Sequence, residues 1–360
     1  MRYILLSILA IVCINSFSQQ KDSFSVQLFA EVYASSVPNK PYDQLRPAYH
    51  YNYTKANTAG LNLALARVHY SSKNFRTNIG FMAGDYPKAN LAAEEPWARN
   101  IYEANAGYKL SKQKELWFDV GILPSHIGSE TAIGKENWSA TRSITADNSP
   151  YYETGAKLSF KPNIKWNFAL LALTGWQRIT IPKNQNWPAV GTQITFTPTS
   201  KFTINSSTFF GNIVTGSKNE NRYYSNLYTN IVLNNKASLN LGWDLGIQES
   251  NNYTTNFVWS GLIAAIRYQL KPNKWSITIR YERFLDKKNL LFTLSENIYH
   301  EFNVHHGSVN LDFLAVKNLL VRVEANYQQA PFPIFRKGTQ LVHNMFSAFF
   351  ICSYNFQYSK

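Results

Sequence analysis

Apolar and polar residues alternate one by one along most of this 360-residue chain. The stretch SLNLGWDLGIQ (238–248) places Leu239 and Trp243 on one face and Asn240 and Asp244 on the other. A period of two is typical of a β-strand whose two sides meet different surroundings. Most of the runs have roughly the 9–11 residues that a tilted strand needs to cross a bilayer.

The alternation predicts about sixteen strands, which is within the range of transmembrane barrels. The predicted strands are 24–33, 60–70, 74–84, 100–110, 115–123, 151–160, 165–178, 189–198, 201–211, 222–233, 237–249, 255–270, 274–284, 304–316, 319–328 and 342–358.

The connections between these runs alternate between short and long. Tight polar turns such as SKQK (111–114) and KPNK (271–274) follow the even-numbered strands. Longer connections follow most odd-numbered strands, and only the link near 250–254 is short. These longer connections are 34–59, 85–99, 124–150, 179–188, 212–221, 285–303 and 329–341. The sequence therefore predicts an all-β fold, a transmembrane antiparallel up-and-down β-barrel with short periplasmic turns and long external loops.

The N-terminus indicates export. In MRYILLSILAIVCINSFSQQ, Arg2 supplies the positive charge of a signal peptide, an apolar segment follows, and Ser16 and Ser18 are the small residues of a cleavage site. We expect residues 1–18 to be a signal peptide and residues 19–360 to form a single barrel domain. A lipoprotein cysteine at Cys13 is the alternative reading.

Composition agrees with a membrane barrel. Only 16% of residues are charged, against roughly 25% in soluble domains, and aromatic residues make up 15%. No apolar run reaches the roughly 18 residues of a transmembrane helix candidate. The formal charge is +14. Export and the even spread of basic residues argue against nucleic acid as a partner.

Aromatic residues on the apolar faces predict the two aromatic girdles of a membrane barrel. In 165–178, Trp166 and Trp176 share a face ten positions apart; ordinary core tryptophans of a soluble protein are the alternative. The girdle candidates are Trp166, Trp176, Trp243, Trp275, Tyr354 and Tyr358. The aromatic final strand resembles the signal read by the barrel-assembly machinery, so this machinery and outer-membrane lipid are expected partners.

The opposite face of the strands is polar and carries charges of both signs. The candidate lumen charges are Arg76, Glu103, Asp119, Glu153, Lys157, Arg280, Glu282, Asp312, Arg322 and Glu324. A barrel of about sixteen strands is too wide for side chains alone to fill, so a polar wall implies water inside. These charges either tune permeation, where the basic excess favours a mild anion preference, or brace the wall as a salt-bridge lattice.

Residues 116–160 resemble the OmpL-like family of outer-membrane β-barrel porins. The shared features are Gly121 and Pro124, Ile127-Gly128, Glu130, Asn137-Trp138, Arg142-Ser143, and Pro150-Tyr151-Tyr152 before Gly155. This resemblance implies a barrel in the outer membrane of Gram-negative bacteria with porin activity. It implies no catalytic residues and no particular solute.

The matching segment contains the third long loop, 124–150. In general-diffusion porins the third external loop folds inward and narrows the pore, so we expect this loop to do the same. The candidate constriction residues are Glu130, Lys135, Glu136, Trp138 and Arg142, with Trp138 anchoring the loop to the wall. An external lid or a mobile surface loop is the alternative.

The sequence thus predicts a porin that passes small hydrophilic solutes or ions by diffusion, with no cofactor and no metal. Two alternatives stay open: a non-conducting structural or adhesin-type barrel, and a membrane hydrolase built on His306 and Ser308. Assembly as a homo-oligomer is expected only by analogy with porins of this size.

The signal-peptide prediction can be checked by mass spectrometry of the exported protein. We expect the mature chain to begin at Gln19, because Ser18 ends the predicted cleavage site. A chain that begins with an acylated Cys13 would contradict this prediction.

Overall fold

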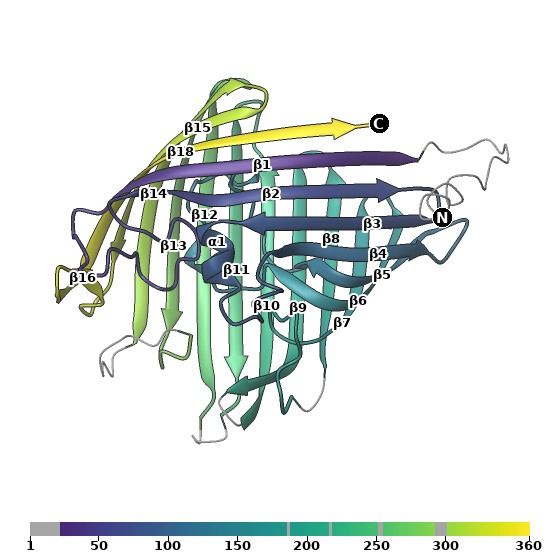
Figure 1. Cartoon of the computed structure of the whole chain (residues 1–360), viewed down its shortest axis with the longest axis horizontal. Coiled ribbons are helices and arrows are strands. Elements are labelled where there is room, and N and C mark those ends of the chain that lie inside the picture. Colours follow the sequence, from purple (N-terminus) through teal and green to yellow (C-terminus); the bar gives the residue numbers. More distant parts are fainter. Residues whose placement is uncertain (1–21, 186–187, 216–217, 251–254, 292–300) are drawn as a thin grey trace, which may run out of the picture.

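The computed structural model describes residues 22–185, 188–215, 218–250, 255–291 and 301–360, so the predicted signal peptide lies outside the described residues. Within these ranges sixteen antiparallel strands close into a single barrel (Figure 1). Each strand pairs with its neighbours in the chain, and the first pairs with the last, which confirms the predicted up-and-down topology.

The barrel strands are β1 Ser23–Ser36, β2 Ala59–Ser71, β3 Phe75–Ala83, β4 Ile101–Lys109, β5 Glu115–Pro124, β6 Tyr152–Asn163, β7 Trp166–Leu173, β8 Ala189–Thr199, β9 Phe202–Thr215, β10 Lys218–Val232, β11 Ala237–Gln248, β12 Phe257–Lys271, β13 Trp275–Asp286, β14 Phe302–Val316, β15 Leu319–Gln329 and β18 Asn344–Ser359. The connections hold a small hairpin, β16 Phe335–Lys337 and β17 Gln340–Val342, and three short helices, α1 Asp85–Asn90, η1 Gly134–Glu136 and α2 Ile144–Asp147.

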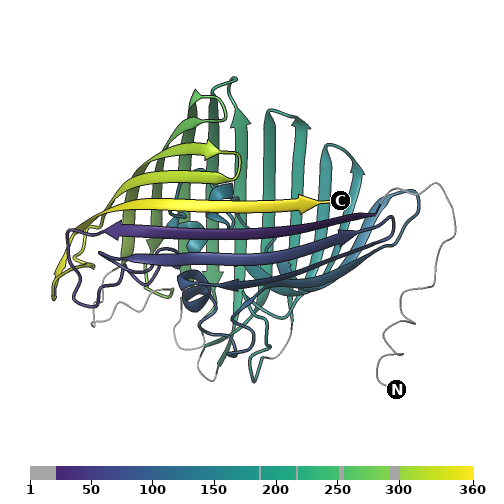
Figure 2. The same ribbon diagram turned by 45° about the horizontal axis from the view of Figure 1, so that its top comes forward.

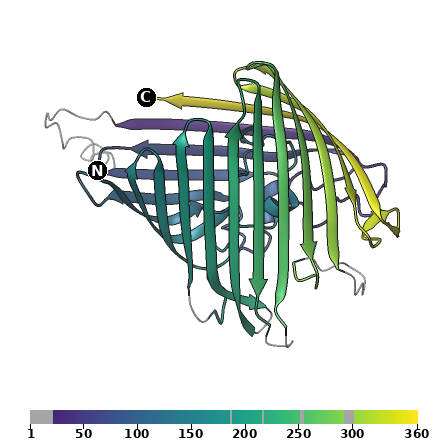
Figure 3. The same ribbon diagram turned by 180° about the vertical axis from the view of Figure 1, so that it is seen from behind.

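Pairing between β1 and β18 closes the barrel. The pairs run without a break from Ser25 opposite Ser359 to Ser36 opposite Ala348. Figure 3 shows the long strands of the opposite wall from behind. Closure satisfies the backbone hydrogen bonds that an open sheet edge would leave exposed, which is the requirement for a sheet inside a bilayer.

Two details of the sequence prediction are wrong. The expected long connection 212–221 is mostly strand, because β9 and β10 continue their ladder as a two-stranded ribbon as far as the pair Thr215–Lys218. The predicted strand 165–178 ends early, at Leu173. Gly175 follows with a φ of +154°, a backbone angle that other residues rarely adopt, and the alternation stops there.

The two faces of the wall differ as predicted. Outward apolar side chains such as Leu170, Leu262 and Phe350 are 57%, 52% and 53% exposed, whereas the inward Glu31 and Glu153 are fully buried. The girdle candidates Trp243, Tyr354 and Tyr358 are exposed on the outer face. Trp166 and Trp275 lie on strand positions of the same outward parity, stacked on neighbouring Phe196 and Phe313.

Trp176 is not a girdle residue. Its ring packs edge-on against Phe209 and Tyr224, two buried residues of the inner wall, with centroid distances of 5.0 and 4.9 Å. The guanidinium of Arg222 lies 5.0 Å from the same ring. Because the chain has left the strand before Trp176, strand parity no longer decides which side of the wall this residue faces.

The long connections fold back against the inner wall. Helix α1 contacts β2 and β3, and α2 contacts β12 and β13. Figure 2 shows these connections gathered at one end of the barrel. An apolar cluster joins loop residues Tyr49, Ile127 and Ile144 to wall residues such as Trp259 and Phe302. None of the helices in the described ranges is long and apolar enough to span a membrane.

The inside–outside assignment predicts losses of stability of different size for two neighbouring substitutions on β8. Ile194 is 44% exposed on the outer face, and Thr195 lies on the inner face with its hydroxyl 2.8 Å from the Asn205 side chain. Because the outer face is predicted to contact lipid, Ile194→Arg should lower the free energy of unfolding by about 2–4 kcal/mol. Thr195→Arg should cost only about 1 kcal/mol, the value of one hydrogen bond.

Denaturant titration of the protein in lipid vesicles measures both values. Equal costs for the two variants would contradict the assignment of the two faces.

Candidate functional site

The third long connection, 124–150, starts by crossing from β5 toward β8 and β10. The Nδ1 atom of His126 lies 2.8 Å from the Glu153 carboxylate. The carbonyl of His126 accepts a hydrogen bond from the Gln193 side chain at 2.9 Å, and the Gly128 amide donates to the Asn226 side chain at 3.1 Å. Since Glu153, Gln193 and Asn226 are inward-facing, this part of the connection lies inside the barrel.

Arg322 of β15 binds the middle of the same segment. Its guanidinium donates to the carbonyl oxygens of Gly134 at 2.7 Å, Asn137 at 2.6 Å and Ser139 at 3.1 Å. It also donates to Asp312 of β14 at 2.8 Å. The planar guanidinium carries five donors, so one side chain can hold three carbonyls and a carboxylate together.

Two buried carboxylates of the wall bind backbone N–H groups of the segment. Glu324 accepts from the amides of Ala140 at 2.7 Å and Thr141 at 3.2 Å, and also from the Thr141 hydroxyl. Glu282 accepts from the Ile144 amide at 2.7 Å. Hydrogen bonds to charged groups contribute about 1.5–3 kcal/mol each, so these contacts fix the path of the segment along the wall.

Two glycines allow the segment to approach the wall closely. A Cβ atom on Gly134 would overlap the Glu31 carboxylate of β1, and one on Gly261 of β12 would overlap Thr145 of α2. A larger residue at either position would displace the Glu31 or the Thr145 side chain.

Glu130 lies at the edge of this bound region. Its carboxylate accepts hydrogen bonds from the Ser143 amide at 3.0 Å and the Ser143 hydroxyl at 2.6 Å, and lies 3.6 Å from Arg280 of β13. Burial raises the pKa of Glu130, although Arg280 acts in the opposite direction. The Ser143 hydroxyl also accepts from the Ala146 amide at 3.0 Å and so caps α2.

Arg142 does not line the lumen, contrary to the prediction that it sets the constriction field. Its side chain is 1% exposed, and its Nε atom lies 3.0 Å from Asp147 of the same segment. The guanidinium lies 3.8 Å from the Tyr151 ring centroid and 4.6 Å from that of Tyr86. The Asp147 carboxylate and the two aromatic faces offset the cost of removing this guanidinium from water.

The other three constriction candidates remain accessible. Glu136 is exposed, and Lys135 is half-buried with its Nζ atom 3.2 Å from the Lys317 carbonyl in the β14–β15 turn. Trp138 is half-buried, and its carbonyl accepts from Asn310 at 3.3 Å. The charged hydrogen bonds to the wall come from Arg322, Glu324 and Glu282, so the Trp138 ring is not the main anchor that the sequence suggested.

The connection between β1 and β2 binds the segment 124–150 through Asp147. The Asp147 carboxylate accepts from the Tyr51 amide at 3.2 Å and lies 3.6 Å from His50. Burial lowers the pKa of His50 to about 3, so it is neutral at pH 7. Sequence reasoning missed these residues because no periodic pattern marks a loop that packs against another loop.

All ten candidate lumen charges lie on the inner face of their strands. Arg76 and Asp119 pair at 2.6 Å, and Arg322 pairs with Asp312. Arg280 forms ion pairs with Glu130 and Glu282, at 3.6 and 3.8 Å. Lys157 has no carboxylate within 4 Å among the described residues.

Two polar cavities of similar size open on the inner wall. A cavity of about 260 Å³ lies between the bound segment and β10–β13; its lining includes Glu130, Glu136, Trp138, Asn230, Asn240 and Arg280. A cavity of about 240 Å³ lies against β3 and β5–β8; its lining includes Arg76, Glu115, Trp117, Lys157, Lys161 and Gln193. Three cations against one carboxylate make the second cavity basic.

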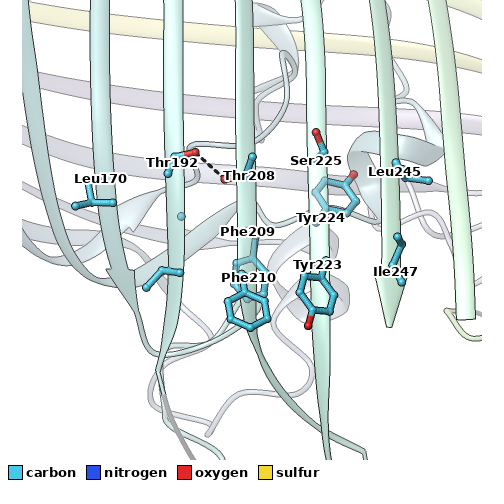
Figure 4. A pocket seen from close by; sticks show the side chains of 12 residues that line it. Leu170, Thr192, Thr208, Phe209, Phe210, Tyr223, Tyr224, Ser225, Leu245 and Ile247 are labelled. Atoms are coloured by element: carbon cyan, nitrogen blue, oxygen red, sulfur yellow. Dashed lines mark hydrogen bonds between the residues drawn. The ribbon is translucent and has the colours of Figure 1, made fainter. Parts of the chain in front are cut away.

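The outer wall carries an apolar hollow of about 340 Å³ over β7–β11 (Figure 4). Small Thr192 and Thr208, hydrogen-bonded to each other at 2.6 Å, lie between the larger Leu170 and Phe210. Most of its lining side chains point away from the interior, so this hollow is not part of the inner site.

The residues considered for hydrolysis form no nucleophile–base pair. His306 is hydrogen-bonded to Glu282, and the hydroxyl of Ser308 has no hydrogen-bond partner among the described residues. His305 points to the other side of β14, where it contacts the Tyr281 hydroxyl at 2.8 Å. Among the described residues, no three His, Cys, Asp or Glu side chains gather in a way that could hold a metal ion.

Comparison with known proteins gives one family and many similar structures. The family model described as "Putative beta-barrel porin-2, OmpL-like" matches residues 23–356. No curated protein sequence matches the chain.

Similar solved structures share the fold at low identity. The anion-selective porin from Comamonas acidovorans is 7% identical, with a TM-score of 0.62 over 93% of this chain and 100% of its own. The outer membrane channel DcaP of Acinetobacter baumannii is 10% identical, with a TM-score of 0.63 over 95% and 100%. OmpT of Vibrio cholerae, in its trimer form, is 10% identical, with a TM-score of 0.54 over 93% and 99%.

The contacts of Arg322 predict how the segment responds to its loss. Arg322→Ala removes three hydrogen bonds to the segment and leaves Asp312 with Arg267 as its only cation among the described residues. Amide hydrogen exchange in 134–141 should become about tenfold faster or more, since 1.4 kcal/mol already corresponds to a factor of ten. Mass spectrometry of exchanged peptides measures this rate.

The matched control is Arg76→Ala, which removes an inner-wall arginine that pairs with Asp119 of β5 and not with the segment. Equal exchange rates in the two variants would show that Arg322 does not hold the segment.

Proposed function

This chain belongs to the OmpL-like beta-barrel porin-2 family, and from that premise we propose that it forms a water-filled channel for small hydrophilic solutes in the bacterial outer membrane. The observation that carries the proposal is the segment 124–150, which runs inside a closed barrel along a polar wall. The width of such a channel and the polarity of its wall determine which solutes diffuse through it, and no chemical step is involved. The role is therefore transport and not catalysis.

We assign the narrowing of the channel to the accessible part of this segment. Glu130, Glu136 and Trp138 line the polar cavity, and Lys135 reaches the β14–β15 turn. The charged hydrogen bonds to β13 and β15 support a fixed constriction rather than a mobile lid. Arg142 has no part in this field because Asp147 neutralises it within the segment.

A mild preference for anions is the expected selectivity. Lys157 and Lys161 line the basic cavity, and the third cation of its lining, Arg76, is paired with Asp119. Lys157 has no carboxylate within 4 Å among the described residues, so its ammonium group remains available to passing anions although Asp119 and Glu153 lie near it. A solved structure with the same fold is an anion-selective porin, which agrees with this expectation.

A non-conducting barrel is the second candidate. The apolar cluster that joins the inward connections to Trp259 and Phe302 supports it, because packed apolar side chains exclude water. We also expect assembly as a homo-oligomer; a trimer form is described for one similar structure, OmpT.

Planar-bilayer recording tests the channel, its constriction and its selectivity together. The purified protein should form discrete channels. Under a salt gradient, the reversal potential should have the sign expected when anions pass more readily than cations. Deletion of 130–145 should raise the single-channel conductance about twofold or more, because it removes the chain that narrows the lumen.

The double substitution Lys157→Gln and Lys161→Gln is the matched variant, and it should shift the reversal potential toward zero without a change in channel size. Absence of channels would support the non-conducting barrel, and an unchanged conductance after the deletion would exclude the constriction.

A further inference from the structure

The cavity between the segment 124–150 and β10–β13 has the chemistry of a binding site. Apolar residues line it on two sides, Trp138 from the loop and Ile263 and Ala265 from the barrel wall. The remaining lining is polar and comes from both the loop and the wall. An aromatic face combined with fixed polar groups is typical of sites that select a solute rather than only admit it.

Two asparagines give the cavity a matched donor and acceptor. Asn230 and Asn240 are opposite each other on β10 and β11, and the Asn240 amide nitrogen donates to the Asn230 oxygen at 2.7 Å. This bond leaves the Asn230 amide nitrogen and the Asn240 amide oxygen without a hydrogen-bond partner in the described ranges. If both amides were turned around, one donor and one acceptor would still remain.

The charges of the cavity largely offset one another. Arg280 lies 3.6 Å from Glu130 and donates two hydrogen bonds to Thr141, so its charge is already engaged. Glu136 is exposed at the edge, with one carboxylate oxygen accepting from the Thr131 hydroxyl at 3.0 Å. Its second oxygen remains available to accept from a solute hydroxyl. A bound anion would meet two carboxylates here, which disfavours it.

We propose that this cavity is a binding subsite for a neutral polyhydroxylated solute of the size of a single sugar ring. A hydroxyl group both donates and accepts, so adjacent hydroxyls match the free donor and acceptor of the Asn230–Asn240 pair. The C–H face of the ring packs on Trp138, whose ring is apolar and large. The volume of about 260 Å³ is below the roughly 300–1,000 Å³ of drug-sized sites, which limits the ligand to one ring.

This proposal rests on the proposed channel function, since the solute must reach the cavity from the lumen. The subsite proposal goes beyond the channel function because it assigns a solute class and a saturable binding site to this part of the inner wall. Uncharged amides on the inward face of β8–β11 support it, including Gln193, Asn205, Asn226, Asn230 and Asn240. The buried charges on the same face, Glu220, Arg222 and Asp244, are not part of the cavity lining.

The test uses D-glucose as the probe and the full-length mature protein in planar bilayers. Glucose should reduce the ion current in a saturable way. Trp138→Ala and the double substitution Asn230→Leu and Asn240→Leu should each raise the half-saturating glucose concentration about tenfold, which corresponds to about 1.4 kcal/mol. Both variants should still conduct in potassium chloride.

The matched control is Asn78→Leu, an inward asparagine of β3 on the other wall, and it should leave the half-saturating concentration unchanged. Saturation-transfer NMR with glucose in detergent gives a second measure of binding that does not depend on current.

The possible outcomes separate the two proposals. Open channels in which glucose acts without saturation, or identically in wild type and both variants, would overturn the subsite and leave the channel intact. Absence of channels would overturn the proposed function; the NMR signal and its loss in the variants would then decide the subsite alone. Stronger saturation by gluconate than by glucose would overturn the neutral class.

Discussion

Closure of the sheet between β1 and β18 is the constraint on which the rest of the structure depends. It pairs the backbone of the first and last strands and creates an interior separate from the outer face. Inside that boundary, buried carboxylates and guanidiniums such as Glu324 and Arg322 can bind the backbone of a long connection. The same charges on an outer face in contact with lipid would be strongly unfavourable.

The strands could be predicted from the sequence because their pattern reports two different environments. Leu262 and Arg267 lie on the same strand, and their parity alone assigns one outward and the other inward. The pattern fails where the environment no longer alternates. Beyond Leu173 both sides of the chain meet protein, so Trp176 packs inward although its parity indicated the outer face. The ends of β9 and β10 form a ribbon through backbone pairing, which an alternation of buried and exposed side chains does not predict.

The inner site was predictable only in part. The family resemblance identified the segment, and Glu130, Glu136 and Trp138 do line the polar cavity. The partners of each residue could not be read from the chain, because they depend on contacts between residues far apart in sequence. Arg142 reads as an exposed charge, yet Asp147 and two tyrosines bury it completely. Asn230 and Asn240 read as ordinary polar wall positions, and only the register makes them a pair.

The contacts of the inner segment also set an order of assembly. Residues 134–141 are held by β15, almost two hundred positions later in the chain, and Gly134 approaches Glu31, about one hundred positions earlier. These partners become neighbours only after the two ends of the chain have met, and contacts over such long loops form late. The segment must therefore dock after the wall is complete. A newly closed barrel would pass through a short-lived state in which its interior is wider than in the finished protein.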